Sequence, residues 1–192
     1  MHLPLETLLQ LKNSELPRLL YERTHSAALT LPTTTAELWL LGLLVLYAAI
    51  ALPVGFRQRL FRFEMVQQWS IVIPTLLIAL IFPALLEEWV FRVLLLPMQT
   101  DATLTSVLGW SSLSLGIFVA AHPLNALIFF PSRRATFTSP TFLVLASLLG
   151  VVCTIAYLQS HSLWPPVAIH WFLVVVWLLW LGGYQRMTPL GQ

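Results

Sequence analysis

Five apolar stretches of this chain are each long enough to cross a lipid bilayer. Spanning takes ~20 apolar residues, and a helix satisfies every backbone N–H and C=O within one segment. Only 9% of the 192 residues are charged, against ~25% in soluble domains. We therefore predict an all-α, polytopic membrane helix bundle with about five transmembrane helices, at roughly 36–55, 69–96, 111–130, 140–159 and 163–183.

The N-terminal segment differs from these spans because leucines at helical spacing alternate with charged residues. We predict an amphipathic helix over residues ~3–22, interrupted at Pro17. Such a helix could lie on the membrane surface or pack against the rest of the protein, and the sequence leaves both open. The chain divides into an amphipathic segment 1–30, a first span with its basic loop 36–65, and a membrane core 66–186.

The basic residues of the loops indicate an orientation. With five spans, all arginine-bearing loops fall on one side of the membrane, and the connections on the other side, 98–110 and 159–163, contain no Lys or Arg. We expect 98–110 to be an interfacial loop or short helix. The positive-inside rule then places the arginine-bearing loops and the C-terminus in the cytoplasm. We expect an integral protein of a bacterial inner or internal membrane. The arginines used here are Arg57, Arg59, Arg62, Arg133, Arg134 and Arg186.

Two adjacent glutamates, Glu87 and Glu88, lie inside the second apolar run. A carboxylate at bilayer depth costs at least ~2.5–3.5 kcal/mol, so such residues are candidates for function. Glu88 and Arg92 are four positions apart, in the favourable order for an ion pair on one helix face. Glu87 is rotated by ~100° from Glu88 and is left without a partner in its helix. We interpret Glu88 and Arg92 as a structural clamp and place Glu87 at a cavity.

Two histidines, His122 and His170, lie in other spans at depths similar to that of Glu87. Counted from the arginine-free face, the depths are ~13 Å for Glu87, ~16 Å for His122 and ~10 Å for His170. Each histidine alone could simply form a hydrogen bond to a neighbouring helix. Together, the three side chains predict one polar cavity among spans two, three and five.

Several chemistries fit one carboxylate and two imidazoles. The carboxylate could act as general base on a water, while the imidazoles donate hydrogen bonds to the oxyanion. The same set could bind zinc, although the His-Glu-x-x-His spacing is absent, or relay protons. A serine mechanism through Gly109-Trp110-Ser111-Ser112 is the weakest alternative. We predict no metal site and no cofactor. The net charge of only +2 does not indicate nucleic-acid binding.

Three motifs resemble the CPBP family, which contains type II CAAX endopeptidases and bacteriocin-processing (Abi) membrane proteins. The Glu-Glu-x-x-x-Arg motif is present at Glu87, Glu88 and Arg92, and the Phe-x-x-x-His motif at Phe118 and His122. Asn125 follows the second motif, as is frequent in the family. The third motif comprises Tyr157, Ser162-Leu163-Trp164-Pro165-Pro166 and His170. The resemblance covers roughly residues 70–180.

The resemblance implies a metal-independent, glutamate-type intramembrane endopeptidase. Glu87 would activate water together with His122, and His170 would help to stabilise the oxyanion. Glu88, Arg92, Phe118 and Asn125 would support the site.

One position departs from the family pattern, since the family usually has Asn or Asp four residues after the last histidine and this chain has Val174. The alternative is therefore a catalytically inactive membrane subunit, or an assembly or protection factor of a larger membrane complex. Expected partners are membrane lipid together with either a membrane protein or peptide substrate or the other subunits of such a complex. The loop count predicts a cavity that opens away from the cytoplasm, which argues against a prenylated cytosolic tail as substrate.

Overall fold

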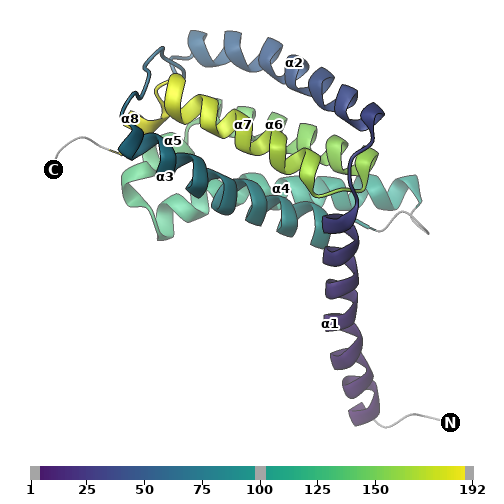
Figure 1. The fold of residues 1–192 in the computed structure, drawn as a ribbon. Helices are drawn as coiled ribbons and strands as arrows, with labels where there is room; N and C mark the ends of the chain where they lie inside the picture. Colours follow the sequence, from purple (N-terminus) through teal and green to yellow (C-terminus); the bar gives the residue numbers. More distant parts are fainter. Residues whose placement is uncertain (1–4, 98–102, 189–192) are drawn as a thin grey trace.

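In a computed structural model of the chain, residues 5–97 and 103–188 are described, and these residues are almost entirely helical, with one isolated bridge and no extended strand (Figure 1). The prediction of an all-α bundle is confirmed. The helices are α1 (Leu5–Leu29), α2 (Thr34–Arg57), α3 (Trp69–Ala79), η1 (Leu80–Glu87), η2 (Trp89–Leu94), α4 (Leu104–Ile128), η4 (Pro131–Arg133), α5 (Arg134–Phe137), α6 (Pro140–Ser160), α7 (Trp164–Trp180) and α8 (Gly183–Met187).

Within the described parts of the chain, four helices are long and apolar enough to cross a membrane: Glu37–Arg57, Trp69–Leu94, Leu104–Ile128 and Pro140–Ser160. The fifth apolar helix, α7, has 17 residues, which is about the shortest length that spans. The expectation of an interfacial segment at 98–110 is wrong for residues 104–110, which belong to α4. Thr103 fixes this early start, because its side chain accepts a hydrogen bond from the Ser106 N–H at 3.2 Å.

The second span changes its winding where the glutamates lie. After α3 it continues as two π-helical segments, η1 and η2, which meet at Glu88. Pro83 lies inside η1, and proline has no N–H and collides with the carbonyl four residues earlier in an α-helix. The wider π-helix accommodates that ring. Such segments are rare and frequently coincide with functional sites.

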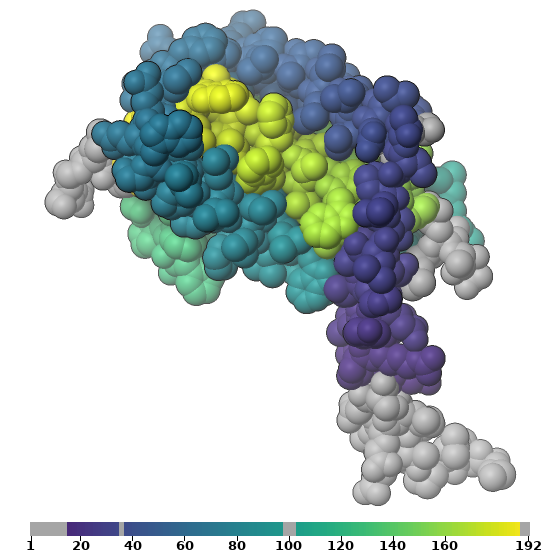
Figure 2. Space-filling view, in the orientation of Figure 1, coloured from purple at the N-terminus to yellow at the C-terminus, as the bar shows by residue number. Residues whose placement is uncertain are grey.

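Helix α6 lies inside the bundle and packs against α2, α4 and α7. Its close approach to α4 requires Gly150, since a Cβ there would lie 2.6 Å from Leu115 Cδ1 and 3.1 Å from Phe118 Cδ1. On the face shown in Figure 2, α7 is visible between α2 and α3. The buried residues of α2, α6 and α7 form one apolar core with Leu60 and Phe61 of the first basic loop.

The N-terminal helix α1 leaves the bundle at a steep angle (Figures 1 and 2). It is longer than predicted and continuous through Pro17, so the expected interruption is wrong. Its C-terminal end packs against the protein: Ala27 O accepts from the Leu163 N–H at 3.0 Å, and Ala28 O accepts from Trp164 Nε1 at 2.8 Å. Residues 15–22 are exposed, and contact between this part and lipid stays a prediction.

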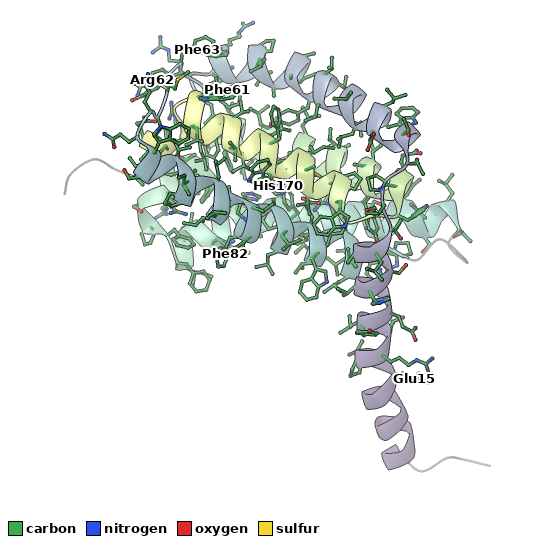
Figure 3. All side chains as sticks on the ribbon, viewed as in Figure 1. Glu15, Phe61, Arg62, Phe63, Phe82 and His170 are labelled. Carbon is green, nitrogen blue, oxygen red and sulfur yellow. The ribbon has the colours of Figure 1, made fainter. Side chains whose placement is uncertain are left out.

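The arginine-bearing loops meet at one end of the bundle, as the five-span count predicts. Segment 62–66 runs along the end of α7, where the Glu64 N–H donates to Trp180 O at 3.1 Å. Arg186 donates to Arg59 O, and α8 contacts η4. Figure 3 shows Phe61, Arg62 and Phe63 at this end, with His170 inside the bundle. We call it the arginine end.

Candidate active site

Glu88 connects two elements at the centre of the bundle. Its Oε2 pairs with Arg92 Nε at 3.1 Å, and its Oε1 accepts a hydrogen bond from His170 Nδ1 at 2.6 Å. All three side chains are almost completely buried. The predicted ion pair with Arg92 is therefore present. The bond to His170 was not predicted, because no local sequence pattern links residues 82 positions apart.

Glu87 is turned toward the cavity. Its side chain is 27% exposed, whereas that of Glu88 is fully buried. The buried Oε2 atom has no hydrogen-bond partner and lies 3.9 Å from His170 Nε2, which is too long for a hydrogen bond. The four side chains follow one another in a row: Arg92, Glu88, His170 and Glu87. Because Glu88 fixes Nδ1 of His170 as a donor, Nε2 is the nitrogen that faces Glu87.

His122 reaches the same region from α4. Its Nδ1 donates to the Phe118 carbonyl at 2.9 Å, which leaves Nε2 free because a carbonyl can only accept. The Phe118 ring stacks edge-to-face with both histidines, at centroid distances of 5.0 Å to His122 and 6.0 Å to His170. One aromatic ring therefore holds both imidazoles beside each other.

Phe118 and Arg92 are positioned by α6. The Arg92 guanidinium lies over the Phe118 ring, with Cζ 4.9 Å from its centroid, and Nη2 donates to Gly150 O at 3.0 Å. Both side chains are fully buried. The Glu88 carboxylate balances the Arg92 charge at this depth, and the Gly150 carbonyl accepts one of its hydrogen bonds, while Nε and Nη1 have no hydrogen-bond partner.

A cavity of about 1040 Å³ adjoins these residues, and Glu87, His122 and His170 all line it. It continues along the C-terminal halves of α4 and α7 to Phe130, Arg133 and other residues of the arginine end. No residue of the opposite connection at 159–163 lines it. The expectation that the cavity opens on the arginine-free side is therefore wrong. The distribution of arginines among the loops indicates the orientation of the chain but not the end at which the helices diverge.

Asn125 and Val174 both line this cavity. Position 174 therefore lies in the wall of the site, where valine offers no side-chain hydrogen-bond donor. Trp177 and Arg133 are among the wall residues for which the sequence indicated no role in the site. The buried Trp177 Nε1 has no hydrogen-bond partner, and Arg133 was interpreted only as a topological charge. Neither lies in a recognisable motif, so only packing could reveal them.

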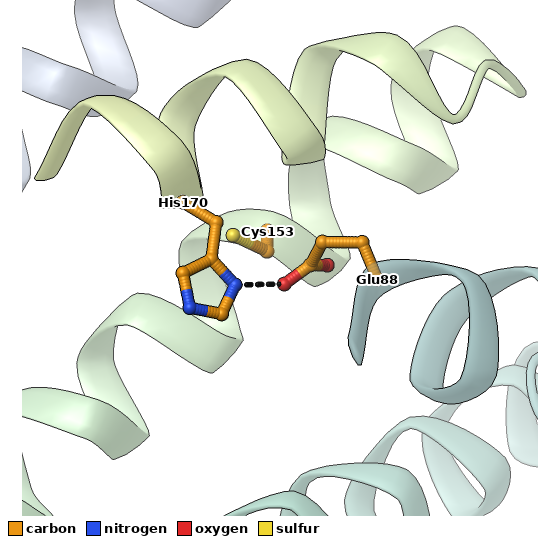
Figure 4. A group of neighbouring side chains, drawn as sticks. All are labelled: Glu88, Cys153 and His170. Atoms are coloured by element: carbon orange, nitrogen blue, oxygen red, sulfur yellow. Dashed lines mark hydrogen bonds and ion pairs between the residues drawn. The ribbon is translucent and has the colours of Figure 1, made fainter. Parts of the chain in front are cut away.

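Glu88, Cys153 and His170 offer three potential metal-ligand atoms within 4.8 Å of one another (Figure 4). This group differs from the set of Glu87 and two histidines considered from the sequence. Both Glu88 oxygens are already engaged by Arg92 and His170, and the Cys153 thiol donates to Pro166 O at 3.6 Å. A divalent cation there would also face the Arg92 charge. The group is better suited to orienting His170.

The structure does not bring the serines of the alternative mechanism close to His122. Ser111 and Ser112 belong to α4, and Ser112 precedes His122 by 10 residues, or about 15 Å along the helix axis. Neither serine lines the cavity. A serine nucleophile must lie within hydrogen-bond reach of its base, so these residues are not a dyad with His122.

Comparison with known proteins connects this site to a family. A family model described as type II CAAX prenyl endopeptidase Rce1-like matches residues 67–176, more than half of the 192-residue chain. The match contains Glu87, His122 and His170, whereas α1 and α2 lie outside it. Neither the curated proteins nor the solved structures gave a match.

Proposed function

Because this chain belongs to the Rce1-like family of type II CAAX prenyl endopeptidases, we propose that it is a metal-independent intramembrane endopeptidase with Glu87 as general base. The observation that carries the proposal is the contrast between the neighbouring glutamates. Glu88 is fully buried, with Oε2 3.1 Å from Arg92 Nε and Oε1 hydrogen-bonded to His170 Nδ1. The ion-pair contact of Glu87 is longer, 3.9 Å to His170 Nε2, and its side chain faces a large cavity.

In the proposed reaction, a water in the cavity loses a proton to Glu87 as its oxygen attacks the substrate carbonyl carbon. His122 accepts a hydrogen bond from this water through Nε2, which is free because Nδ1 is bonded to Phe118 O. Glu87 then returns the proton to the departing amine. General base catalysis of this type contributes about 10²–10⁴-fold to the rate.

His170 has two roles in this proposal. Its Nδ1–H is fixed by Glu88, and with a second proton on Nε2 it balances the charge of Glu87, so that the row from Arg92 to Glu87 has no net charge. The Nε2–H then also lies beside the carbonyl oxygen that becomes negative. Donors preorganised in this way stabilise the oxyanion without reorganisation during the reaction.

The arginine end supports a substrate on the cytoplasmic side. The positive-inside rule assigns arginine-bearing loops to the cytoplasm, and the cavity reaches that end of the bundle. A membrane-anchored protein with a C-terminal tail on the cytoplasmic side could therefore enter. This removes the objection to a prenylated tail, which is the substrate class named in the family description.

One observation favours a second function. Val174 lines the cavity at the position where the resemblance leads us to expect an amide. Loss of one oxyanion donor costs about 10²–10³ in rate. A member that lacks this donor could retain the scaffold and bind a membrane protein without cutting it.

Cleavage of an S-prenylated peptide by the purified protein in neutral detergent tests the two functions. Glu87→Gln should lower kcat by about 10²–10⁴-fold, while Glu15→Gln on the exposed part of α1 should leave it unchanged. Equal rates for wild type and Glu87→Gln would exclude the proposed mechanism. Binding without cleavage by the wild type would favour the scaffold.

A further inference from the structure

The wall of the cavity contains a charged side chain near each end. Among the described residues that line it, Glu87 and Arg133 are the members that are Asp, Glu, Lys or Arg. Glu87 lies at the inner end, beside the two histidines. Arg133 lies at the arginine end, just beyond the last turn of α4. The wall between them is largely apolar and includes Phe137 and Phe142.

Arg133 is held in place but has no acidic partner. Its backbone N–H donates to Phe130 O at 2.9 Å, and its guanidinium lies over the Phe130 ring with Cζ 4.6 Å from the centroid. Phe130 itself lines the cavity. Arg18, Arg62 and Arg92 each pair with a glutamate, whereas Arg133 pairs with no carboxylate of the described residues. Its hydrogen-bonding edge is therefore available to a ligand.

We propose that Arg133 binds the free C-terminal carboxylate of the peptide whose scissile carbonyl lies beside Glu87. The inference rests on the proposed function and adds a determinant of substrate choice to it. A guanidinium and a carboxylate match in shape and form two parallel charge-assisted hydrogen bonds. The carboxylate would thus fix the far end of the bound peptide at Arg133 while its scissile carbonyl lies beside Glu87.

The spacing of the wall suits a short C-terminal segment. His122 precedes the end of α4 at Ile128 by six residues, or about 9 Å along the axis. Extended peptide covers about 3.3–3.6 Å per residue, so about three residues cover this length of the wall. Their side chains would meet the aromatic wall, where Phe137 and Phe142 pack edge-to-face with His122 at 5.8 Å and 5.4 Å.

Two peptides that differ only at the C-terminus test the inference. One S-prenylated peptide ends in a free carboxylate and the other in a primary amide, and kcat/KM is measured for both in neutral detergent. We expect wild type to prefer the free acid by about tenfold to a hundredfold. Arg133→Gln should remove the preference. The matched control Arg134→Gln should keep it, because Arg134 is adjacent and exposed but does not line the cavity.

The affinity of each labelled peptide for the Glu87→Gln variant, with and without Arg133→Gln, separates the two proposals. If the free acid binds more tightly and Arg133→Gln abolishes this preference, the inference stands. A wild type that binds the peptide in this way but does not cleave it would contradict only the proposed function. An equal preference with and without Arg133 would overturn the inference, as would the absence of binding by both peptides. Loss of the preference on adding phosphatidylglycerol would assign Arg133 to a lipid headgroup and likewise overturn it.

Discussion

Glu88 and His170 are joined by a 2.6 Å hydrogen bond between Oε1 and Nδ1, inside a bundle where each comes from a different span. The bond gives Glu88 a role beyond the clamp with Arg92, because it orients the imidazole that faces Glu87. Carboxylate–histidine pairs of this kind set which ring nitrogen carries the proton. Glu88 is therefore a positioning residue for His170, and the proposed chemistry belongs to Glu87.

Glu88→Gln should reduce both stability and activity. An amide would leave the Arg92 guanidinium buried without its counter-ion, and breaking such a pair costs about 3–5 kcal/mol. Thermal unfolding in detergent measures the expected fall in Tm. Glu64→Gln removes the carboxylate partner of the exposed Arg62 and should cost less than about 1 kcal/mol. Equal shifts in Tm for the two variants would contradict a structural role for the buried pair.

The two histidines should respond differently to substitution by glutamine. His122 is bonded to a carbonyl of its own helix, so His122→Gln should lower kcat by about 10²-fold with little change in Tm. His170→Gln removes the partner of the buried Glu88 and should lower both kcat and Tm. Parallel measurement of kcat and Tm distinguishes the variants, and a large fall in Tm for His122→Gln would show that its role is mainly structural.

Val174→Asn should raise the rate of peptide cleavage. Residue 174 lines the cavity, and an added amide N–H would supply an oxyanion donor whose contribution is about 10²–10³-fold in kcat. Val175→Asn is the matched control, since residue 175 is not part of the cavity wall. A gain restricted to Val174→Asn supports the predicted position of the oxyanion. Unchanged activity in both variants would place it elsewhere.

Gly150→Ala should destabilise the protein by about 1–3 kcal/mol. The new methyl group would lie 2.6 Å from Leu115 and 3.1 Å from Phe118, so α6 and α4 would have to separate. Gly116→Ala, with nothing within 4 Å of the added Cβ, should be neutral or slightly stabilising. The difference in Tm between these variants measures the close contact that supports Phe118, and no difference would mean that the helices are not held this closely.

The orientation can be tested with single cysteines. Cys153 is the one native cysteine of the sequence and is fully buried, so it should stay unlabelled. His161→Cys and Arg134→Cys place thiols at exposed positions at opposite ends of the bundle. A membrane-impermeant maleimide added outside intact cells should label residue 161 and spare residue 134. The reverse pattern would put the cavity mouth outside and exclude a cytosolic tail as substrate.

Local sequence patterns predicted most of the fold. Apolar runs located the helices because lipid demands continuous backbone hydrogen bonding. The four-residue spacing predicted the pair of Glu88 and Arg92, which is present at 3.1 Å. The depths of Glu87, His122 and His170 predicted a shared cavity, and all three line it. Their catalytic roles remain a proposal.

Long-range features could not be predicted in this way. The early start of α4, the continuity of α1 through Pro17 and the π-helical winding around the glutamates depend on capping and packing. The direction of the cavity was predicted incorrectly, since loop charges report the orientation of the chain and not the divergence of its helices.

The sequence by itself determined a membrane bundle with a costly pair of buried glutamates, because length, hydropathy and helical spacing are local properties. The tertiary structure decided that Glu88 contacts both Arg92 and His170, while Glu87 faces the cavity at 3.9 Å from His170. It also decided that the cavity reaches Arg133. These contacts join residues from separate spans, and their distances depend on how close-packed helices such as α4 and α6 fit together.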